Sequence, residues 1–478
     1  MLFNSFQFLV FFPAVTIVYF LLKPAWRWAW LLAASCYFYM AFIPAYILVL
    51  FLLIVVDYGA ARKIEQSEGA ARKTWLVFSI GTTVLILFVF KYFNFFQGAI
   101  AQVFAAFGGH YTPPVSTLIL PLGLSFHTFQ SLSYVIEVYR KNYRAERHFG
   151  IYALYVMFFP QLVAGPIERP YNLLPQFRDI HRFDEARIAE GLKRMAWGFF
   201  KKIVIADRLA VYVNAVYGNP ADYYGWPVIM ATYFFAFQIY CDFSGYSDIA
   251  IGAGQVLGFR LMENFRQPYF ARSIAEFWQR WHISLSSWFR DYLYFPLGGN
   301  RVTLLRRCVN IMIVFIISGL WHGANWTFVA WGALHGFYRV VSLLTQEWKA
   351  GLAQALGIER WKELYKFLQS LITFHLVLLG WVLFRARSLA DAQLILSRMF
   401  NFSIGMPVNS GISWDLLVVL WVLVGFLVIV EMIQCRIGLR ILLSRQPWLL
   451  RMAVYYLLLM GIILYGEFGS RQFIYFQF

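Results

Sequence analysis

Long apolar runs recur from one end of this chain to the other, and they constrain its fold more than any other feature. Of the 478 residues, 60% are hydrophobic and only 14% are charged, whereas about a quarter of the residues in soluble domains are charged. Many of the runs approach the roughly 20 residues that a membrane-spanning helix needs. We therefore expect an all-α, polytopic integral membrane protein with about 11–13 membrane helices, re-entrant segments included.

The predicted spans follow the apolar runs along the chain, and no internal repeat relates them. They cover residues 6–22, 28–42, 46–60, 75–95, 117–139, 195–217, 227–250, 309–321, 325–344, 367–384, 416–432 and 452–465. Residues 151–165 have basic residues on both sides and end near two prolines, so we expect them to be re-entrant. No charged stretch is long enough for a soluble unit, and residues 1–478 are predicted to form a single membrane domain.

The net charge of +17 comes from lysines and arginines in short loops between the apolar runs. This distribution follows the positive-inside rule, so the basic loops are expected in the cytoplasm. These loops are residues 62–73, 140–147, 169–202 and 266–307. Nucleic-acid binding is not expected, because the basic residues do not form one patch. The four cysteines lack metal-ligand spacing and are expected to be buried free thiols, so no metal site is predicted.

His322 interrupts this apolar pattern between two predicted spans. No Asp, Glu, Lys or Arg occurs from Cys308 to Tyr338, and tryptophans lie on both sides of the histidine. About 14 apolar residues precede it, or roughly 21 Å of helix, so it should lie inside a bilayer core roughly 30 Å thick. A titratable imidazole at this depth is costly unless it has a partner or lines a wet cavity, so a functional role is the default hypothesis. His322 is therefore predicted to be catalytic, whereas His127, His335 and His375 are expected to be packing residues.

Two further segments carry candidate residues. Residues 276–292 are predicted to form one amphipathic helix that enters from the cytoplasmic face, with His282 at the border of its aromatic side. For His282, packing and function are equally consistent with the sequence. Residues 238–248 place Asp242 and Asp248 at the end of a span, and these acids either form structural ion pairs with nearby arginines or face a substrate.

The triplet Trp321-His322-Gly323 and the segment 280–299 resemble the membrane-bound O-acyltransferase (MBOAT) family, and the chain is most similar to its alginate O-acetyltransferase membrane-subunit branch. Further matching segments are residues 1–5, 160–167, 240–248, 380–386 and 473–478. The resemblance covers the whole chain. It places the motif-bearing core at about residues 117–345, with flanking helices at residues 1–116 and 346–478.

The resemblance implies membrane helices around an intramembrane tunnel, with His322 as the essential histidine and His282 as the second one. It implies transfer of an acetyl group from a cytosolic thioester, acetyl-CoA or an acyl-carrier protein, with no permanently bound cofactor. The expected partner is a periplasmic esterase-like acetyltransferase of the SGNH type, which would pass the group to an extracellular polysaccharide such as alginate. The expected location is the bacterial inner membrane, among membrane lipids.

The chemistry of acyl transfer agrees with these residues. It needs a base for the hydroxyl, donors for the oxyanion and exclusion of water from the thioester. A neutral imidazole suits the first task, Asn325 or nearby tyrosine and tryptophan donors the second, and tryptophans the third. The residues expected to bind substrate or line the tunnel are Trp321, Asn325, Trp326, Arg280, Trp281, Trp288, Asp291, Tyr292, Tyr240, Asp242, Tyr246 and Asp248.

Two alternatives remain open at this point. The same fold could acylate peptidoglycan, teichoic acid, a lipid or a protein instead of a polysaccharide. A protein of another class, a polysaccharide-pathway transporter, could use the intramembrane acids and histidines as a path, although such proteins often contain inverted repeats. The chain lacks a GxSxG elbow, a P-loop and an HExxH motif, so the corresponding chemistries are not predicted.

Overall fold

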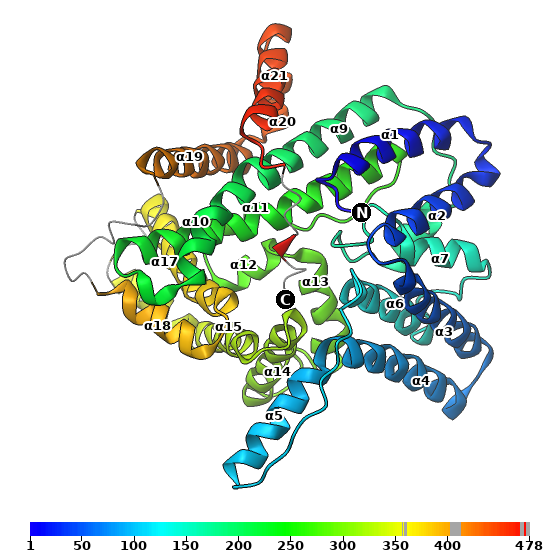
Figure 1. The fold of residues 1–478 in the computed structure, drawn as a ribbon, viewed down its shortest axis with the longest axis horizontal. Coiled ribbons are helices and arrows are strands. Elements are labelled where there is room, and N and C mark those ends of the chain that lie inside the picture. Colours follow the sequence, from blue (N-terminus) through cyan, green and yellow to red (C-terminus); the bar gives the residue numbers. More distant parts are fainter. Residues whose placement is uncertain (356, 358–360, 402–412, 469–472, 475–478) are drawn as a thin grey trace. The chain divides into compact units, whose positions relative to one another are not determined.

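The computed structural model describes residues 1–355, 357, 361–401, 413–468 and 473–474. Their regular elements are helices, which are drawn in Figure 1, and no β-strand is assigned among these described residues, which confirms the all-α class. They divide into two compact units, which are described separately below. Unit 1 comprises Met1–Met195 and Ser247–Met262, and unit 2 comprises Ala196–Tyr246 and the described residues from Glu263 onward. The expectation of a single membrane domain stays a prediction.

Unit 1 consists mainly of the helices that precede residue 195. They are α1 (Phe6–Leu21), α2 (Pro24–Met40), α3 (Ile47–Gln66), α4 (Gly69–Leu87), α5 (Phe93–Ala106), α6 (Leu124–Tyr139), α7 (Phe149–Met157), α8 (Pro170–Gln176) and most of α9 (Glu185–Phe199). A π-helical segment, Phe88–Tyr92, joins α4 to α5. The predicted span 117–139 starts late, at Leu124, because Gly123 has a left-handed backbone with φ 72°.

Unit 2 holds the remaining helices of the described chain. They are α10 (Asp207–Gly218), α11 (Trp226–Leu257, whose end belongs to unit 1), α12 (Ile274–Arg280), α13 (Ile283–Phe289), α14 (Leu304–His322), α15 (Trp326–Leu344), α16 (Gln346–Ala355), α17 (Lys362–Arg385), α18 (Leu389–Met399), α19 (Trp414–Arg436), α20 (Leu439–Ser444) and α21 (Trp448–Tyr465).

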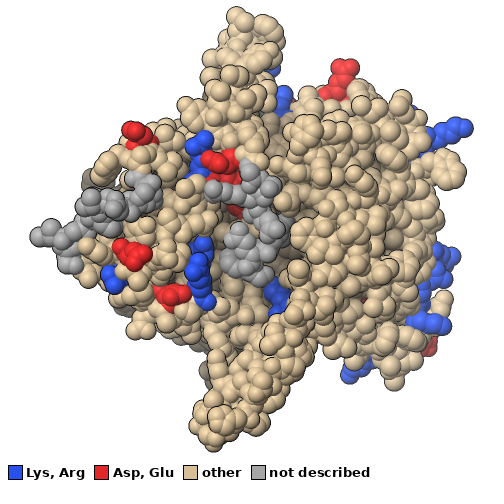
Figure 2. Space-filling view, viewed as in Figure 1, with Lys and Arg blue, Asp and Glu red and all other residues tan. Residues whose placement is uncertain are grey.

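Six helical segments in the described part of the chain are long and apolar enough to cross a membrane. They are Pro44–Gln66, Gly69–Ala106, α14, α17, α19 and α21. On α21, Leu457 is 72% exposed and Ile463 is 63% exposed. Figure 2 shows few charged side chains on the face that it presents. Apolar helix surfaces of this kind are stable in lipid, so the chain is a multi-pass membrane protein.

The predicted re-entrant segment is helical only in its first part. α7 ends at Met157, and the residues from Phe158 to Arg169 are buried without forming a regular helix. The side-chain amide of Gln161 donates to the carbonyl of Tyr155 at 2.8 Å. Broken backbone of this kind is tolerated at membrane depth where protein surrounds it, and the re-entrant interpretation stays a prediction.

The α14–α15 hairpin positions His322, and glycines allow its two helices to pack closely. A Cβ on Gly319 would lie 2.2 Å from the carbonyl oxygen of Phe328, and a Cβ on Gly332 would lie 2.3 Å from that of Phe315. Real Cβ contacts do not occur at such distances, so these helices contact each other through their backbones. The pattern is that of small residues at helix interfaces in membranes. It holds the end of α14, where His322 lies, against α15.

We expect Gly332→Ala to destabilise this hairpin, because the added methyl group would meet a backbone carbonyl that cannot rotate away. Overpacking of this kind costs about 1–3 kcal/mol, and the melting temperature of the purified protein in detergent should fall. Gly425→Ala in α19 is the matched control, because a Cβ there meets nothing within 4 Å. Equal melting temperatures for the two variants would contradict the close packing of α14 and α15.

Candidate active site

The segment around His282 is not the single helix that the sequence predicts. α12 ends at Arg280 and α13 begins at Ile283, and between them His282 has a left-handed backbone with φ 44°. Residues other than glycine rarely adopt this conformation unless surrounding contacts fix it. The prediction of one continuous helix over residues 276–292 is therefore wrong. His282 lies at a helix break and not on the border of a helical face.

Asn264 supplies the contacts that fix this break. Its backbone carbonyl accepts a hydrogen bond from the N–H of Ile283 at 2.9 Å. Its side-chain Oδ1 accepts from the N–H of Ser284 at 3.3 Å and from the Ser284 hydroxyl at 3.0 Å. The same Oδ1 lies 3.0 Å from Nδ1 of His282. One amide side chain thus caps the start of α13 and orients the imidazole.

These contacts also assign the tautomer of His282. A backbone N–H can only donate, so the Asn264 atom that faces Ser284 is the acceptor oxygen. Nδ1 of His282 must therefore carry a proton. In the neutral imidazole the lone pair then lies on Nε2, which can accept a proton or a hydrogen bond. Burial lowers the pKa of His282 to about 3, so the ring is neutral at physiological pH.

His322 is buried at the C-terminal end of α14, among aromatic rings. Its ring centroid lies 4.9 Å from that of Trp321, 5.0 Å from that of Trp331 and 5.4 Å from that of Phe384. The helix ends here because Gly323 adopts extended backbone. The predicted turn at His322-Gly323 is confirmed.

The two predicted histidines belong to one aromatic cluster within unit 2. Trp321 contacts both of them, with its ring centroid 6.3 Å from His282 and 4.9 Å from His322. Trp281, which is 1% exposed, packs at 4.9 Å against Trp381 of α17. Aromatic walls of this kind exclude water, and a thioester substrate needs this exclusion to avoid hydrolysis. Trp281 and Trp321 thus belong to this cluster, and their expected role in lining a tunnel stays a prediction.

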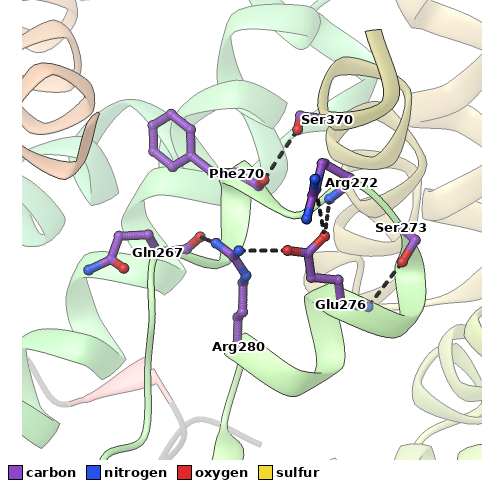
Figure 3. Close-up of polar contacts among 7 residues, drawn as sticks. All are labelled: Gln267, Phe270, Arg272, Ser273, Glu276, Arg280 and Ser370. Carbon is purple, nitrogen blue, oxygen red and sulfur yellow. Dashed lines mark hydrogen bonds and ion pairs between the residues drawn. The ribbon is translucent and has the colours of Figure 1, made fainter. Parts of the chain in front are cut away.

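Arg280, which was expected to line a tunnel, takes part in an ion-pair cluster beside α12 (Figure 3). Its guanidinium lies 2.6 Å from a carboxylate oxygen of Glu276 and also donates to the carbonyl of Gln267 at 3.4 Å. The N–H of Arg272 donates to the second carboxylate oxygen at 2.8 Å. Although burial alone would raise it, these contacts and the two arginine charges hold the pKa of Glu276 below its usual value. The cluster stabilises the last turns of α12, which end directly before the break at His282.

The two acids of residues 238–248 form ion pairs. Asp248 lies 2.9 Å from the guanidinium of Arg194 within unit 1. In unit 2, Asp242 contacts the buried ammonium of Lys202, so its partner is a lysine and not the expected arginine. The second carboxylate oxygen of Asp242 accepts from the N–H of Ile474 at 2.8 Å. These contacts favour the structural interpretation, because a buried charge requires a partner.

The remaining predicted residues have structural contacts of their own. Asn325 caps α15 by accepting from the N–H of Thr327 at 3.0 Å, and its amide donates to the carbonyl of Arg387 at 2.9 Å. Trp326 is 48% exposed, and its expected role in lining the tunnel stays a prediction. The hydroxyl of Tyr240 donates to Glu431 at 2.9 Å.

Four further predicted residues have contacts away from the two histidine rings. Trp288 packs against Tyr292 at 5.0 Å, and Asp291 pairs with Arg290 at 2.8 Å. The ring of Tyr246 lies 5.0 Å from that of Phe473. A substrate-binding role for these side chains stays a prediction.

Sequence reasoning missed several residues of the cluster. Asn264 orients His282 from 18 residues away, a tertiary contact that no local pattern reveals. Trp331 contacts His322 from α15, one helical turn before His335, and this spacing was a signal that could have found it. Trp381 and Phe384 lie in residues 380–386, which the family resemblance included without giving them a role.

The sequence of the chain is similar to those of known proteins of one family. The family model of the membrane-bound O-acyltransferases matches residues 147–351, a range that contains both histidines. A probable alginate O-acetylase of Pseudomonas aeruginosa is 39% identical over 409 residues, covering 84% of this chain and 75% of the relative. The chain belongs to the membrane-bound O-acyltransferase family. As a member of this family it is an acyltransferase.

Two other relatives of this acyltransferase act on different polymers by their names. A peptidoglycan O-acetyltransferase of Helicobacter pylori is 36% identical over 440 residues, covering 84% of this chain and 80% of that protein. A teichoic acid D-alanyltransferase of Streptococcus thermophilus is 30% identical over 285 residues, covering 55% of this chain and 68% of that protein.

Asn264→Ala should lower the acyl-transfer rate by roughly 10- to 100-fold, because His282 loses the partner that sets its tautomer and orientation. Loss of the cap on α13 should cost about 0.5–2 kcal/mol of stability. The rate and the melting temperature are both measured on purified protein. Asn94→Ala is the control, because its amide makes exposed hydrogen bonds with Ser116. A wild-type rate in Asn264→Ala would show that His282 needs no such partner.

Proposed function

We propose that this acyltransferase is an O-acetyltransferase of the bacterial inner membrane that serves an extracellular or periplasmic polysaccharide such as alginate. The acetyl group would come from a cytosolic thioester, acetyl-CoA or an acyl-carrier protein. A periplasmic esterase-like protein of the SGNH type would receive it and pass it to the polymer. The observation that carries the proposal is the burial of His282 and His322 in one aromatic cluster, together with the likeness to alginate O-acetylases.

In this proposal His322 is the general base. A hydroxyl group of the acceptor attacks the carbonyl carbon of the thioester while His322 takes its proton. The tetrahedral intermediate then collapses, the carbon–sulfur bond breaks, and the imidazolium of His322 returns the proton to the departing thiolate. Each proton and bond is accounted for without a metal or a redox partner. The aromatic rings around His322 keep water from competing with the acceptor.

In this proposal His282 is a positioning residue. Polarising a carbonyl would require an N–H on the ring, but the Nδ1–H of His282 faces Asn264. The neutral ring offers Nε2 as an acceptor, so it suits the binding and orientation of a substrate O–H or N–H group. This assigns His282 to positioning a reacting partner, with His322 moving the proton.

Peptidoglycan is the second candidate polymer. The peptidoglycan O-acetyltransferase of Helicobacter pylori is almost as similar to this chain, over a comparable share of its length, as the probable alginate O-acetylase. Both reactions need the same acetyl transfer across the membrane and differ only in the final acceptor. The transporter alternative is set aside, because membership of the family makes the protein an acyltransferase.

His322→Ala should lower acetylation of the polymer by at least about a hundredfold, the contribution typical of a general base. The measurement is the ester content of alginate and of peptidoglycan from a deletion strain that carries the variant. Which of the two polymers loses its esters identifies the acceptor.

His375→Ala is the matched control for this experiment, because His375 is an exposed histidine of α17 that is hydrogen-bonded to Tyr233 at 2.7 Å. Membrane levels of both variants are compared by immunoblotting. Near-normal ester content in both polymers with His322→Ala would refute the catalytic assignment.

A further inference from the structure

His335 is a third buried histidine beside the candidate site. It lies on α15 and is 0% exposed. Its ring centroid is 5.0 Å from that of Trp331 and 5.1 Å from that of Trp278, and these two indole rings lie 5.6 Å from each other. Three rings from α12 and α15 therefore contact one another. Trp331 also contacts His322 at 5.0 Å, so a single ring lies between His335 and the proposed base.

Packing explains the rings of this cluster but not their nitrogen atoms. Within the described chain, no hydrogen-bond partner reaches either ring nitrogen of His335 or the indole nitrogens of Trp278, Trp331 and Trp381. All of these atoms are buried. A buried polar group without a partner is costly, so several such groups in one place call for a partner such as a ligand or a buried water. The expectation that His335 is only a packing residue is therefore incomplete.

The chemistry of these atoms restricts the ligand. An indole N–H can only donate, so it needs an acceptor oxygen. A neutral imidazole both donates and accepts, so the ligand also needs a donor. A secondary amide combines a strong carbonyl acceptor with an N–H donor, so it can satisfy both kinds of group. A sugar hydroxyl can also donate and accept, but it is a weaker match to several indole donors in a nearly dry aromatic cluster.

The position of the cluster points to the acyl donor and not to the acceptor. His335 and His322 each lie 5.0 Å from Trp331, so their ring centroids are separated by no more than twice that distance. An amide a few bonds from the thioester sulfur could therefore reach His335 while the carbonyl carbon lies at His322. A Cβ on Gly380 of α17 would lie 2.6 Å from Nε2 of His335, so the glycine is needed for the imidazole to adopt this position.

We propose that His335, with the indole N–H groups of Trp278 and Trp331, binds a secondary amide of the acyl donor and thereby positions its thioester at His322. The inference rests on the proposed acetyl transfer from a thioester. It adds a binding site for the thiol arm of the donor and makes His335 a positioning residue, acting through the amide and not on the reacting atoms.

The test compares two short donors on the purified full-length protein in detergent. S-Acetyl-N-acetylcysteamine carries one secondary amide near its sulfur, whereas S-butyl thioacetate carries none, and thiol release is followed with each. Acetyl-CoA serves as the reference donor. The variants are His335→Phe, which keeps an aromatic ring, and His335→Gln, which keeps a donor and an acceptor. His375→Phe is the matched control, because it makes the same substitution at an exposed histidine.

In His335→Phe, kcat/KM for the amide-bearing donor should fall about tenfold or more, and kcat/KM for the amide-free donor should change less than about twofold. His335→Gln should recover part of the loss, and His375→Phe should match the wild type.

An equal loss on both donors would make His335 purely structural and overturn the inference. So would a wild type that turns over acetyl-CoA but shows no preference for the amide-bearing short donor. A wild type that releases no thiol from any donor would refute the proposed function itself.

Discussion

The close backbone packing of α14 against α15 is the contact on which the candidate site depends. Gly319 and Gly332 bring the helices together at carbonyl distance, and the turn between them holds only three residues. This geometry places His322, at the end of one helix, against Trp331, near the start of the other. In a membrane such packing is favoured because lipid gives no hydrophobic drive to helix association, so close contact between small residues supplies it. The position of His322 against Trp331 thus depends on the two glycines, which have no side chain to hold the helices apart.

A second constraint is the cost of burying polar groups, and unit 2 meets it by pairing them. Lys202 has two carboxylate partners, Asp207 at 2.8 Å and Asp242. Asp242 also accepts from the backbone of Ile474, so this ion pair anchors a residue near the end of the described chain. Removing one member of a buried pair costs about 3–5 kcal/mol. The buried charges of Lys202, Asp207 and Asp242 therefore serve mainly to hold the scaffold, and the proposed chemistry rests on the two imidazoles.

The sequence predicted the parts of the fold and the site that depend on local pattern. The apolar runs predicted helices, and the end of α14 at His322 followed from a glycine after a long apolar run. The break at His282 could not be predicted, because the periodicity of residues 276–292 suits one helix and the break depends on Asn264. Likewise, the partner of Asp242 is a lysine on another helix. Trp326 appeared suited to the site by its position beside His322, yet its direction on α15 leaves it half exposed. Such contacts depend on how helices pack, which one-dimensional spacing does not encode.

The central claim is that the thioester is cleaved at His322, inside the aromatic cluster of unit 2. The most direct measurement is a cryo-electron microscopy structure of the full-length protein with a non-hydrolysable acetyl-thioether analogue of the donor. The acyl end of the analogue should lie beside the His322 imidazole, with room between them for one acceptor hydroxyl at about 3–3.5 Å from the carbonyl carbon, the distance of reacting atoms. Density for the acyl end in unit 1, or in unit 2 but separated from His322 by the tryptophans, would contradict the account.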